Sequence, residues 1–425
     1  MAIRPHYSRS TRFHIMILQG RLLIDPKQIP KEGWLRIENG HIAEIEQGSP
    51  PKEPEAGSRD AMICPGFVDA HLHPPQFDVM GCDRLELLDW LDRVIYPAEA
   101  RWSDKAFAET HALESHRRML AAGTLGYAGF LTSHEHSVMA ITKAAQQIPL
   151  RALAGQVLMD RHAPEELLEN RIARLARSEK GRLDCSLNPR FAPACSDDLL
   201  ADTGRRLGES FPFSFKQREA GEKGTELFMQ THLAESRAEC EWVRALFPDD
   251  EHYTGVYDRH GLLTNRTLLA HCVHLADDEW ELIAARNCVV VHCPGANTFL
   301  QSGVFDLNKA RAYGVRLALG SDVGAGCDLA MPRVARAMIE VAKLRRMTID
   351  PSAHVPTSVE AWNLITRHNA QALGFHDMGR IEVGASADLL ILRLPFAYDA
   401  HLIGRLIHTW RDEYITHRVL NGRIA

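Results

Sequence analysis

The 425-residue sequence lacks the features of secreted, membrane and redox proteins. Its nine cysteines include no C-x-x-C pair and no cluster typical of a disulfide framework. This excludes zinc ribbons, thioredoxin-like redox sites and zinc deaminases with paired cysteine ligands. The apolar run near the N-terminus, Ile15 to Leu18, is too short for a signal peptide, and no run approaches the roughly 18 apolar residues of a membrane span. We therefore expect a cytoplasmic protein in a reducing compartment, with no membrane partner.

An excess of positive charge and several common catalytic motifs are also missing. Lys and Arg total 49 and Asp and Glu total 55, so the formal net charge of −6 gives no general attraction to nucleic acid. The patterns H-E-x-x-H, G-x-G-x-x-G, G-x-x-x-x-G-K-S/T and G-x-S-x-G do not occur. Zincin, dinucleotide-binding, P-loop and nucleophile-elbow enzymes therefore lack support, and we expect no nucleic-acid partner.

The sequence has instead a pattern of buried strands that alternate with helices. Its hydrophobic content is 45%, which is enough for a full core. Amphipathic segments with helical spacing, such as residues 197–208 and 234–247, separate most of the short apolar runs. These runs are CPGFVDA, GTLGYAGF, LRALAGQVLM, DCSLNP, ELFMQTH, TLLAHC, CVVVHC and VRLALGSD. Eight such strands predict an α/β fold of the (β/α)8 TIM barrel type.

Both ends of the chain have the pattern of β structure. Asn39 and Gly40 predict a two-residue hairpin turn within residues 13–46, and the same pair recurs at Asn421 and Gly422. We expect the two ends to form one small β-sandwich domain. The predicted division assigns residues 1–62 and 379–425 to this domain and residues 63–378 to the barrel.

Histidine is abundant, with 22 residues, and it is both the commonest metal ligand and the usual near-neutral acid or base. His71 and His73 directly follow the run CPGFVDA, and residues i and i+2 at a strand end point to the same side. Random placement of 22 histidines predicts about one H-x-H pair, so this pair alone is weak evidence. His134 and His136 form a second pair with no third ligand in register, and we interpret them as outside the metal site.

Further candidate ligands recur at the ends of other predicted strands. His232 ends ELFMQTH, His271 ends TLLAH, and Asp322 follows VRLALGS. In a barrel these positions face the C-terminal mouth, where catalytic groups gather, although each residue alone can also be a polar strand terminator. Neutral histidines and one carboxylate suit a zinc or ferrous ion with a position open for water, whose pKa the metal lowers. Glu235, three residues after His232, is either a proton carrier above the metal or a cap at a helix start.

Together these motifs resemble the amidohydrolase superfamily, and in particular those of its members that deaminate guanine. The resemblance runs through nearly the whole chain. It rests on the segments PGFVDAHLH, HLHPPQF, LLDWLDRVIYPAEARW, NPRFAPACS, THLAE, VYDRHGLLTNRTLLAHCVHL, HCPGANTFLQSG and GSDVGAG.

The resemblance implies roles for particular residues, a cofactor and an assembly. The implied residues are the metal ligands His71, His73, His232 and Asp322, the catalytic residues Glu235, Asp322 and His271, and the substrate-binding residues Gln76, Arg190 and Phe191. The segment DCSLNPRF lacks the bridging lysine of binuclear relatives, which favours one zinc ion per chain, although ferrous iron suits the same ligands. A homodimer is also implied.

The implied activity is hydrolytic deamination of guanine to xanthine and ammonia. An Arg190 fork suits O6 and N7 of guanine, Phe191 can pack on the planar ring, and the Gln76 amide can pair with its edge. A surface salt bridge for Arg190 and a core position for Phe191 are the plain alternatives. Two other functions stay open: hydrolysis of another heterocycle, such as 8-oxoguanine, a pterin or a triazine, and a barrel that serves only as a scaffold.

Overall fold

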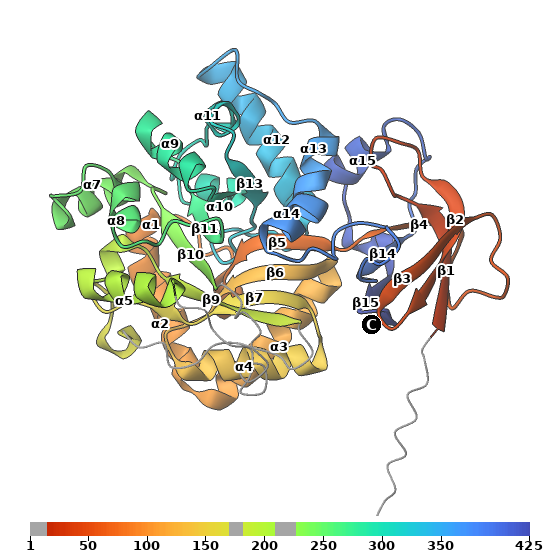
Figure 1. Cartoon of the computed structure of the whole chain (residues 1–425), viewed down its shortest axis with the longest axis horizontal. Helices are drawn as coiled ribbons and strands as arrows, with labels where there is room; N and C mark the ends of the chain where they lie inside the picture. Colours follow the sequence, from red (N-terminus) through yellow and green to blue (C-terminus); the bar gives the residue numbers. More distant parts are fainter. Residues whose placement is uncertain (1–14, 170–181, 209–226) are drawn as a thin grey trace, which may run out of the picture.

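The computed structural model describes residues 15–169, 182–208 and 227–425, which form a barrel of parallel strands beside a smaller sheet (Figure 1). Residues 13, 14 and 226, at the ends of predicted strand segments, lie outside the described residues. Within the described ranges, no helix is both long and apolar enough to cross a membrane.

The barrel contains eight parallel strands in the order β13-β12-β11-β10-β9-β7-β6-β5, and the short β8 (Val157–Leu158) also pairs with β9. The eight are β5 (Phe67–Leu72), β6 (Thr124–Phe130), β7 (Arg151–Gly155), β9 (Leu183–Pro189), β10 (Phe228–Leu233), β11 (Thr267–His271), β12 (Val289–His292) and β13 (Arg316–Leu319). Every residue of β6, β11 and β12 is buried, as expected for parallel strands that helices cover. The predicted (β/α)8 barrel is therefore confirmed.

Helices lie around the outside of the strands (Figure 1). The two predicted amphipathic segments form α5 (Asp197–Leu207) and α7 (Arg237–Leu246). Each is preceded by a serine, Ser196 or Ser236, whose hydroxyl accepts a hydrogen bond from a backbone N–H of the first turn. These caps satisfy donors that a helix start leaves free. Other helices include α3 (Lys105–Ala122), α4 (Glu135–Gln147), α9 (Asp277–Ala285) and α12 (Met331–Thr348).

A buried side chain bridges the first and last strands of the barrel. Asn369, at the start of α14 (Asn369–Ala372), donates from Nδ2 to the carbonyls of Val68 in β5 and Leu319 in β13, both at 2.7 Å. Its Oδ1 accepts from the Leu319 N–H at 2.9 Å. Gly320 permits a close approach here, because a Cβ at this position would lie 2.7 Å from Cβ of His71. The seam therefore brings the C-terminal ends of β5 and β13 together.

The two ends of the chain form the second sheet, in the order β16-β15-β14-β4-β1-β2-β3. Its strands are β1 (Ile15–Leu22), β2 (Lys31–Glu38), β3 (His41–Gln47), β4 (Ala56–Pro65), β14 (Leu389–Leu392), β15 (Ile415–Leu420) and β16 (Arg423–Ile424). The predicted turns are present, with φ of 52° and 85° at Asn39 and Gly40 and of 50° and 72° at Asn421 and Gly422. A small β unit built from both ends is therefore confirmed. Its strands form one continuous sheet, and their buried side chains make up a separate apolar core.

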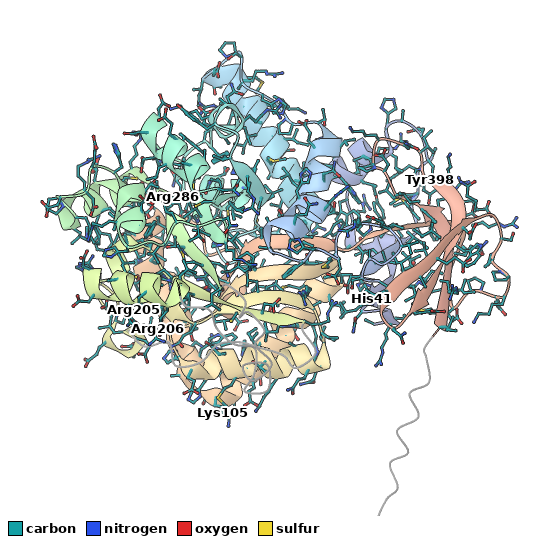
Figure 2. All side chains as sticks on the ribbon, in the orientation of Figure 1. His41, Lys105, Arg205, Arg206, Arg286 and Tyr398 are labelled. Atoms are coloured by element: carbon teal, nitrogen blue, oxygen red, sulfur yellow. The ribbon has the colours of Figure 1, made fainter. Side chains whose placement is uncertain are left out.

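A buried ion pair ties the small sheet to the barrel. Arg182, just before β9, donates to the two carboxylate oxygens of Asp388 at 3.0 and 2.8 Å, and both side chains are buried. Tyr398, labelled beside the small sheet in Figure 2, adds a contact between the chain ends, because its hydroxyl donates to the Asp60 carbonyl at 2.8 Å. The predicted boundary after residue 62 falls inside β4, and the division into domains stays a prediction.

Candidate active site

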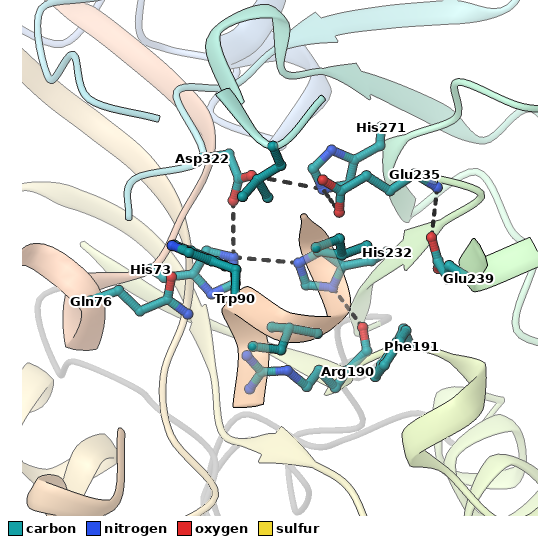
Figure 3. Close-up of a pocket in the computed structure, with 13 residues that line it drawn as sticks. His73, Gln76, Trp90, Arg190, Phe191, His232, Glu235, Glu239, His271 and Asp322 are labelled. Atoms are coloured by element: carbon teal, nitrogen blue, oxygen red, sulfur yellow. Dashed lines mark hydrogen bonds and ion pairs between the residues drawn. The ribbon is translucent and has the colours of Figure 1, made fainter. Parts of the chain in front are cut away.

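The ends of three barrel strands bring four candidate metal ligands together: His71, His73, His232 and Asp322. Figure 3 shows the last three of them. The atoms His71 Nε2 and His73 Nε2 lie 3.4 and 3.2 Å from Asp322 Oδ1. His232 Nε2 lies 3.4 Å from His73 Nε2. One ligand atom from each of the four residues falls within 4.8 Å of all the others. Parallel strands place these residues at one mouth of the barrel.

Burial sets the charge state of the cluster. It lowers the pKa of His71, lowers that of His73 to about 4 and holds that of His232 well below its usual value. Burial opposes ionisation of Asp322 as well, but the imidazoles of His71 and His73 hold its pKa well below the ordinary value. The cluster therefore offers three neutral imidazoles and one carboxylate near neutral pH.

The hydrogen bonds around the cluster leave its centre free for a cation. His232 donates from Nδ1 to the Arg190 carbonyl at 2.6 Å, which leaves the Nε2 lone pair pointing toward the cluster. Buried His71 Nε2 has no hydrogen-bond partner among the described residues. A donor set of three imidazole nitrogens and one carboxylate suits zinc or ferrous iron. The residues present therefore fit a single transition-metal ion.

His271 lies beside these four residues and is held by a separate partner. It donates from Nδ1 to Asn297 Oδ1 at 2.8 Å, in α10 (Pro294–Phe299), while its Nε2 lies 3.8 Å from Asp322 Oδ2. The backbone at His271 and Asp322 is left-handed, with φ of 74° and 51°. Such conformations are costly for residues with side chains and gather at functional sites.

Glu235 faces the same space from the end of β10. Its Oε2 lies 3.3 Å from His271 Nε2, and its Oε1 accepts from the Ser302 hydroxyl at 2.9 Å. Its backbone N–H donates to Glu239 Oε2 at 2.8 Å, so the capping carboxylate of α7 also fixes this loop. Burial, with the nearby Asp322 charge, raises the pKa of Glu235 to about 8. A carboxyl with this pKa can hold or release a proton near neutral pH.

The three expected substrate-binding residues line the pocket next to the cluster. Arg190 and Gln76 are buried, and both contact buried Glu99 in α2 (Tyr96–Ala100). Phe191 is also buried, with its ring centroid 6.1 Å from that of Trp242. The plain alternative for Arg190, a surface salt bridge, is excluded because the ion pair with Glu99 is fully enclosed.

The pocket combines this polar group with apolar walls. Its lining residues are His73, Gln76, Leu87, Trp90, Leu91, Arg190, Phe191, His232, Glu235, Glu239, His271, Leu300 and Asp322. The apolar side chains of this lining limit the contact of the polar groups with water, which strengthens the electrostatic interactions inside. His134 and His136 are not among these residues, and His134 Nδ1 instead contacts Thr132 Oγ1 at 3.2 Å.

Sequence reasoning missed several residues that support the site. Glu99, Asn297 and Ser302 all lie in segments that carried the family resemblance. Their spacing along the chain gave no sign that they contact Arg190, His271 and Glu235, respectively. Glu239 had a local signal, since Ser236 and Glu239 form the S-x-x-E capping box at the start of α7.

Known proteins resemble this chain in both sequence and architecture. Residues 62–425 match the amidohydrolase family. Guanine deaminase of Escherichia coli K12 is 33% identical over 343 residues, which cover 79% of this chain and 73% of the relative. Guanine deaminase of Dictyostelium discoideum is 32% identical over 351 residues, which cover 80% of this chain and 74% of the relative.

A solved structure extends the likeness to three dimensions. Guanine deaminase from C. acetobutylicum, with guanine bound in its active site, superimposes with a TM-score of 0.86 at 27% identity, covering 97% of this chain and 100% of that one. The resemblance inferred from the motifs is confirmed. The chain belongs to the amidohydrolase family and is similar along most of its length to the guanine deaminases within it.

Proposed function

We propose that this protein hydrolyses guanine to xanthine and ammonia. In this reaction a C–O bond forms at the ring carbon that bears the amino group, the C–N bond breaks, and ammonia leaves with the transferred protons. The observation that carries the proposal is the placement of Arg190 and Gln76 beside the His71, His73, His232 and Asp322 cluster. Donors for a purine carbonyl thus adjoin a group suited to hydrolytic chemistry. The guanine held by the C. acetobutylicum relative supports the same substrate.

The proposed cofactor is one zinc ion per chain, held by His71, His73, His232 and Asp322. When bound, such an ion supplies an activated water for hydrolysis near neutral pH. Ferrous iron suits the same donors, so metal analysis of the purified protein decides between them.

Glu235 is proposed as the proton carrier. With a pKa raised to about 8 by burial, it can take a proton during attack by water and give it to the ring nitrogen next to the reacting carbon. Its distance of 3.3 Å from His271 Nε2 places both side chains around the same reacting centre. His271 would hold the attacking oxygen and the growing negative charge, while Asp322 is a second acceptor for the proton of the water.

The base itself would lie against Arg190, Gln76 and Phe191. Arg190 offers N–H donors to the O6 and N7 acceptors of guanine, and the Gln76 amide pairs with the polar edge of the ring. Buried Phe191 provides an apolar contact. We also propose that the protein is cytoplasmic, which agrees with nine unpaired cysteines, and that it forms a homodimer, as the family resemblance implies.

An ultraviolet assay with a panel of substrates tests the proposed function. Purified, metal-loaded protein is offered guanine, 8-oxoguanine, adenine, cytosine and a chlorotriazine under the same conditions. We expect the highest kcat/KM with guanine and formation of xanthine, because only guanine matches both the Arg190 donors and the position of the amino group. A higher kcat/KM with any other compound would refute the choice of guanine, and inactivity toward all of them would favour the scaffold alternative.

A further inference from the structure

One buried carboxylate holds both of the residues that we expect to recognise the base. Glu99 Oε2 accepts from Arg190 Nη1 at 2.7 Å and Glu99 Oε1 accepts from Arg190 Nη2 at 3.1 Å. The same Oε1 accepts from Gln76 Nε2 at 2.8 Å. The Glu99 side chain is fully buried and is not among the residues that line the pocket. Among the described residues, its hydrogen bonds to the pocket lining go to Arg190 and Gln76, through which it can act on a ligand.

The helix that carries Glu99 also contacts the face of the guanidinium. Tyr96, one turn earlier in α2, places its ring centroid 5.3 Å from Arg190 Cζ. One helical turn thus holds the edge of the guanidinium through Glu99 and its face through Tyr96. A long side chain held in this way loses little further conformational freedom when a ligand binds.

Counting donors shows what Glu99 leaves for a ligand. An arginine side chain has five N–H groups, and the Glu99 carboxylate takes two of them, one from each terminal nitrogen. Gln76 gives one of its two amide N–H groups to Glu99, while its Oε1 accepts from the Gly324 N–H at 3.3 Å. These contacts fix which way the Gln76 amide points. The remaining donors are therefore presented in one fixed arrangement.

The same contact removes the net charge of the recognition group. Arg190 carries one positive charge and Glu99 one negative charge, and both side chains are buried. A cation without a partner would attract anions strongly in such an enclosed site. With the charge balanced, hydrogen-bond geometry selects the ligand.

We propose that Glu99 is a positioning residue that orients Arg190 and Gln76 and tunes the pocket to a neutral purine base. This inference rests on the proposed function and names how its substrate is selected. When Glu99 is neutralised, the charge of a base, and not its shape alone, should affect how tightly the pocket binds it.

The first test is the steady-state kinetics of Glu99→Gln with guanine. The variant keeps the size of the side chain but sets an amide N–H against the Arg190 donors. We expect KM for guanine to rise roughly tenfold or more, with a smaller change in kcat. The reason is that the variant loses the charged hydrogen bonds that orient Arg190 and Gln76, the residues proposed to bind the base. A KM within twofold of the wild type would refute the positioning role.

The second test compares a neutral and an anionic purine as competitive inhibitors. In mildly alkaline buffer, at a pH between the pKa values of the two bases, xanthine is an anion whereas hypoxanthine is still neutral. In Glu99→Gln the ratio of the two inhibition constants should shift toward xanthine by about tenfold or more, because the Arg190 charge is no longer balanced. A loss of packing alone would weaken both inhibitors alike, so an unchanged ratio would contradict the proposal.

Asp388→Asn provides a matched control. It also neutralises a buried carboxylate paired with an arginine, but it lies where the small sheet meets the barrel. Its thermal stability should fall while KM for guanine and the inhibitor ratio stay as in the wild type. If Asp388→Asn shifted the inhibitor ratio as much as Glu99→Gln, the effect would be a general result of breaking a buried ion pair and the proposal would be wrong.

A double variant keeps the test decisive if Glu99→Gln does not fold. Removing both charges, in Glu99→Gln with Arg190→Gln, avoids an unpaired buried cation. Because Glu99 also holds Gln76, the comparison is made in a chain that carries Gln76→Ala as well. If Glu99 acts through Arg190 and Gln76, KM of Glu99→Gln with Arg190→Gln in that chain should lie close to KM of Arg190→Gln in the same chain. A further rise of tenfold on adding Glu99→Gln would refute the proposal.

Failure of the proposed function would have a different signature. A wild-type protein that leaves guanine unchanged would refute the function. Turnover of guanine by the wild type, with KM and inhibitor ratio unchanged in Glu99→Gln, would refute only the role of Glu99.

Discussion

Two imidazoles of the site are oriented by carbonyl oxygens of residues other than the four candidate metal ligands. The Arg190 backbone carbonyl accepts from His232 Nδ1, and Asn297 Oδ1 accepts from His271 Nδ1. The bond from His232 leaves the lone pair of its Nε2 free for a metal, and the bond from His271 turns its Nε2 toward the reacting centre. Partners of this kind matter because a small rotation of an imidazole moves its reactive nitrogen away from the reacting atoms.

Replacing Asn297 tests this view at the scale of one residue. Asn297→Ala removes the acceptor of His271, and we expect kcat with guanine to fall roughly 10- to 100-fold. The bound metal should be unchanged, since His271 is not one of the four clustered ligands. Asn297→Asp, which keeps an oxygen acceptor at the same place, should retain most of the activity. Wild-type kcat in Asn297→Ala would show that the contact has no part in catalysis.

At the scale of elements, the barrel depends on how its first and last strands meet. His71 lies near the C-terminal end of β5, and Asp322 follows the end of β13. Asn369 is hydrogen-bonded to both strands. Further along, the Asp322 N–H donates to the His71 carbonyl at 2.8 Å. The seam therefore fixes the distance between two of the proposed metal ligands.

Loss of the Asn369 side chain should weaken this seam. In Asn369→Ala two buried carbonyls and one buried N–H lose their partner, and the free energy of unfolding should fall by at least about 2 kcal/mol. Urea denaturation followed by circular dichroism measures this change. Gln371→Ala, at an exposed position of the same helix, should stay within about 0.5 kcal/mol of the wild type. Equal stability of the two variants would contradict the importance assigned to the seam.

At the scale of the whole molecule, local patterns predicted the elements, whereas contacts between distant segments were found only in the structure. Strand ends could be located because buried apolar runs stop at polar residues, and barrel topology then placed those ends at one mouth. The hairpins at Asn39 and Asn421 followed from the left-handed conformation that Asn-Gly accepts. By contrast, Glu99 and Arg190 are 91 residues apart, and Asn369 and Val68 are 301 apart. No local spacing encodes such pairs, because the folded chain alone brings them together.

The most direct test of the central claim compares guanine turnover by the wild type and Glu235→Gln at equal metal content. The variant keeps the shape of the side chain but cannot carry the proton, so kcat should fall by roughly 10²- to 10⁴-fold. Glu241→Gln, the same change at an exposed position of α7, serves as the control and should turn over guanine like the wild type. A large loss of xanthine formation in Glu235→Gln alone, with the metal retained, is the predicted result. Near wild-type turnover in that variant would contradict the account.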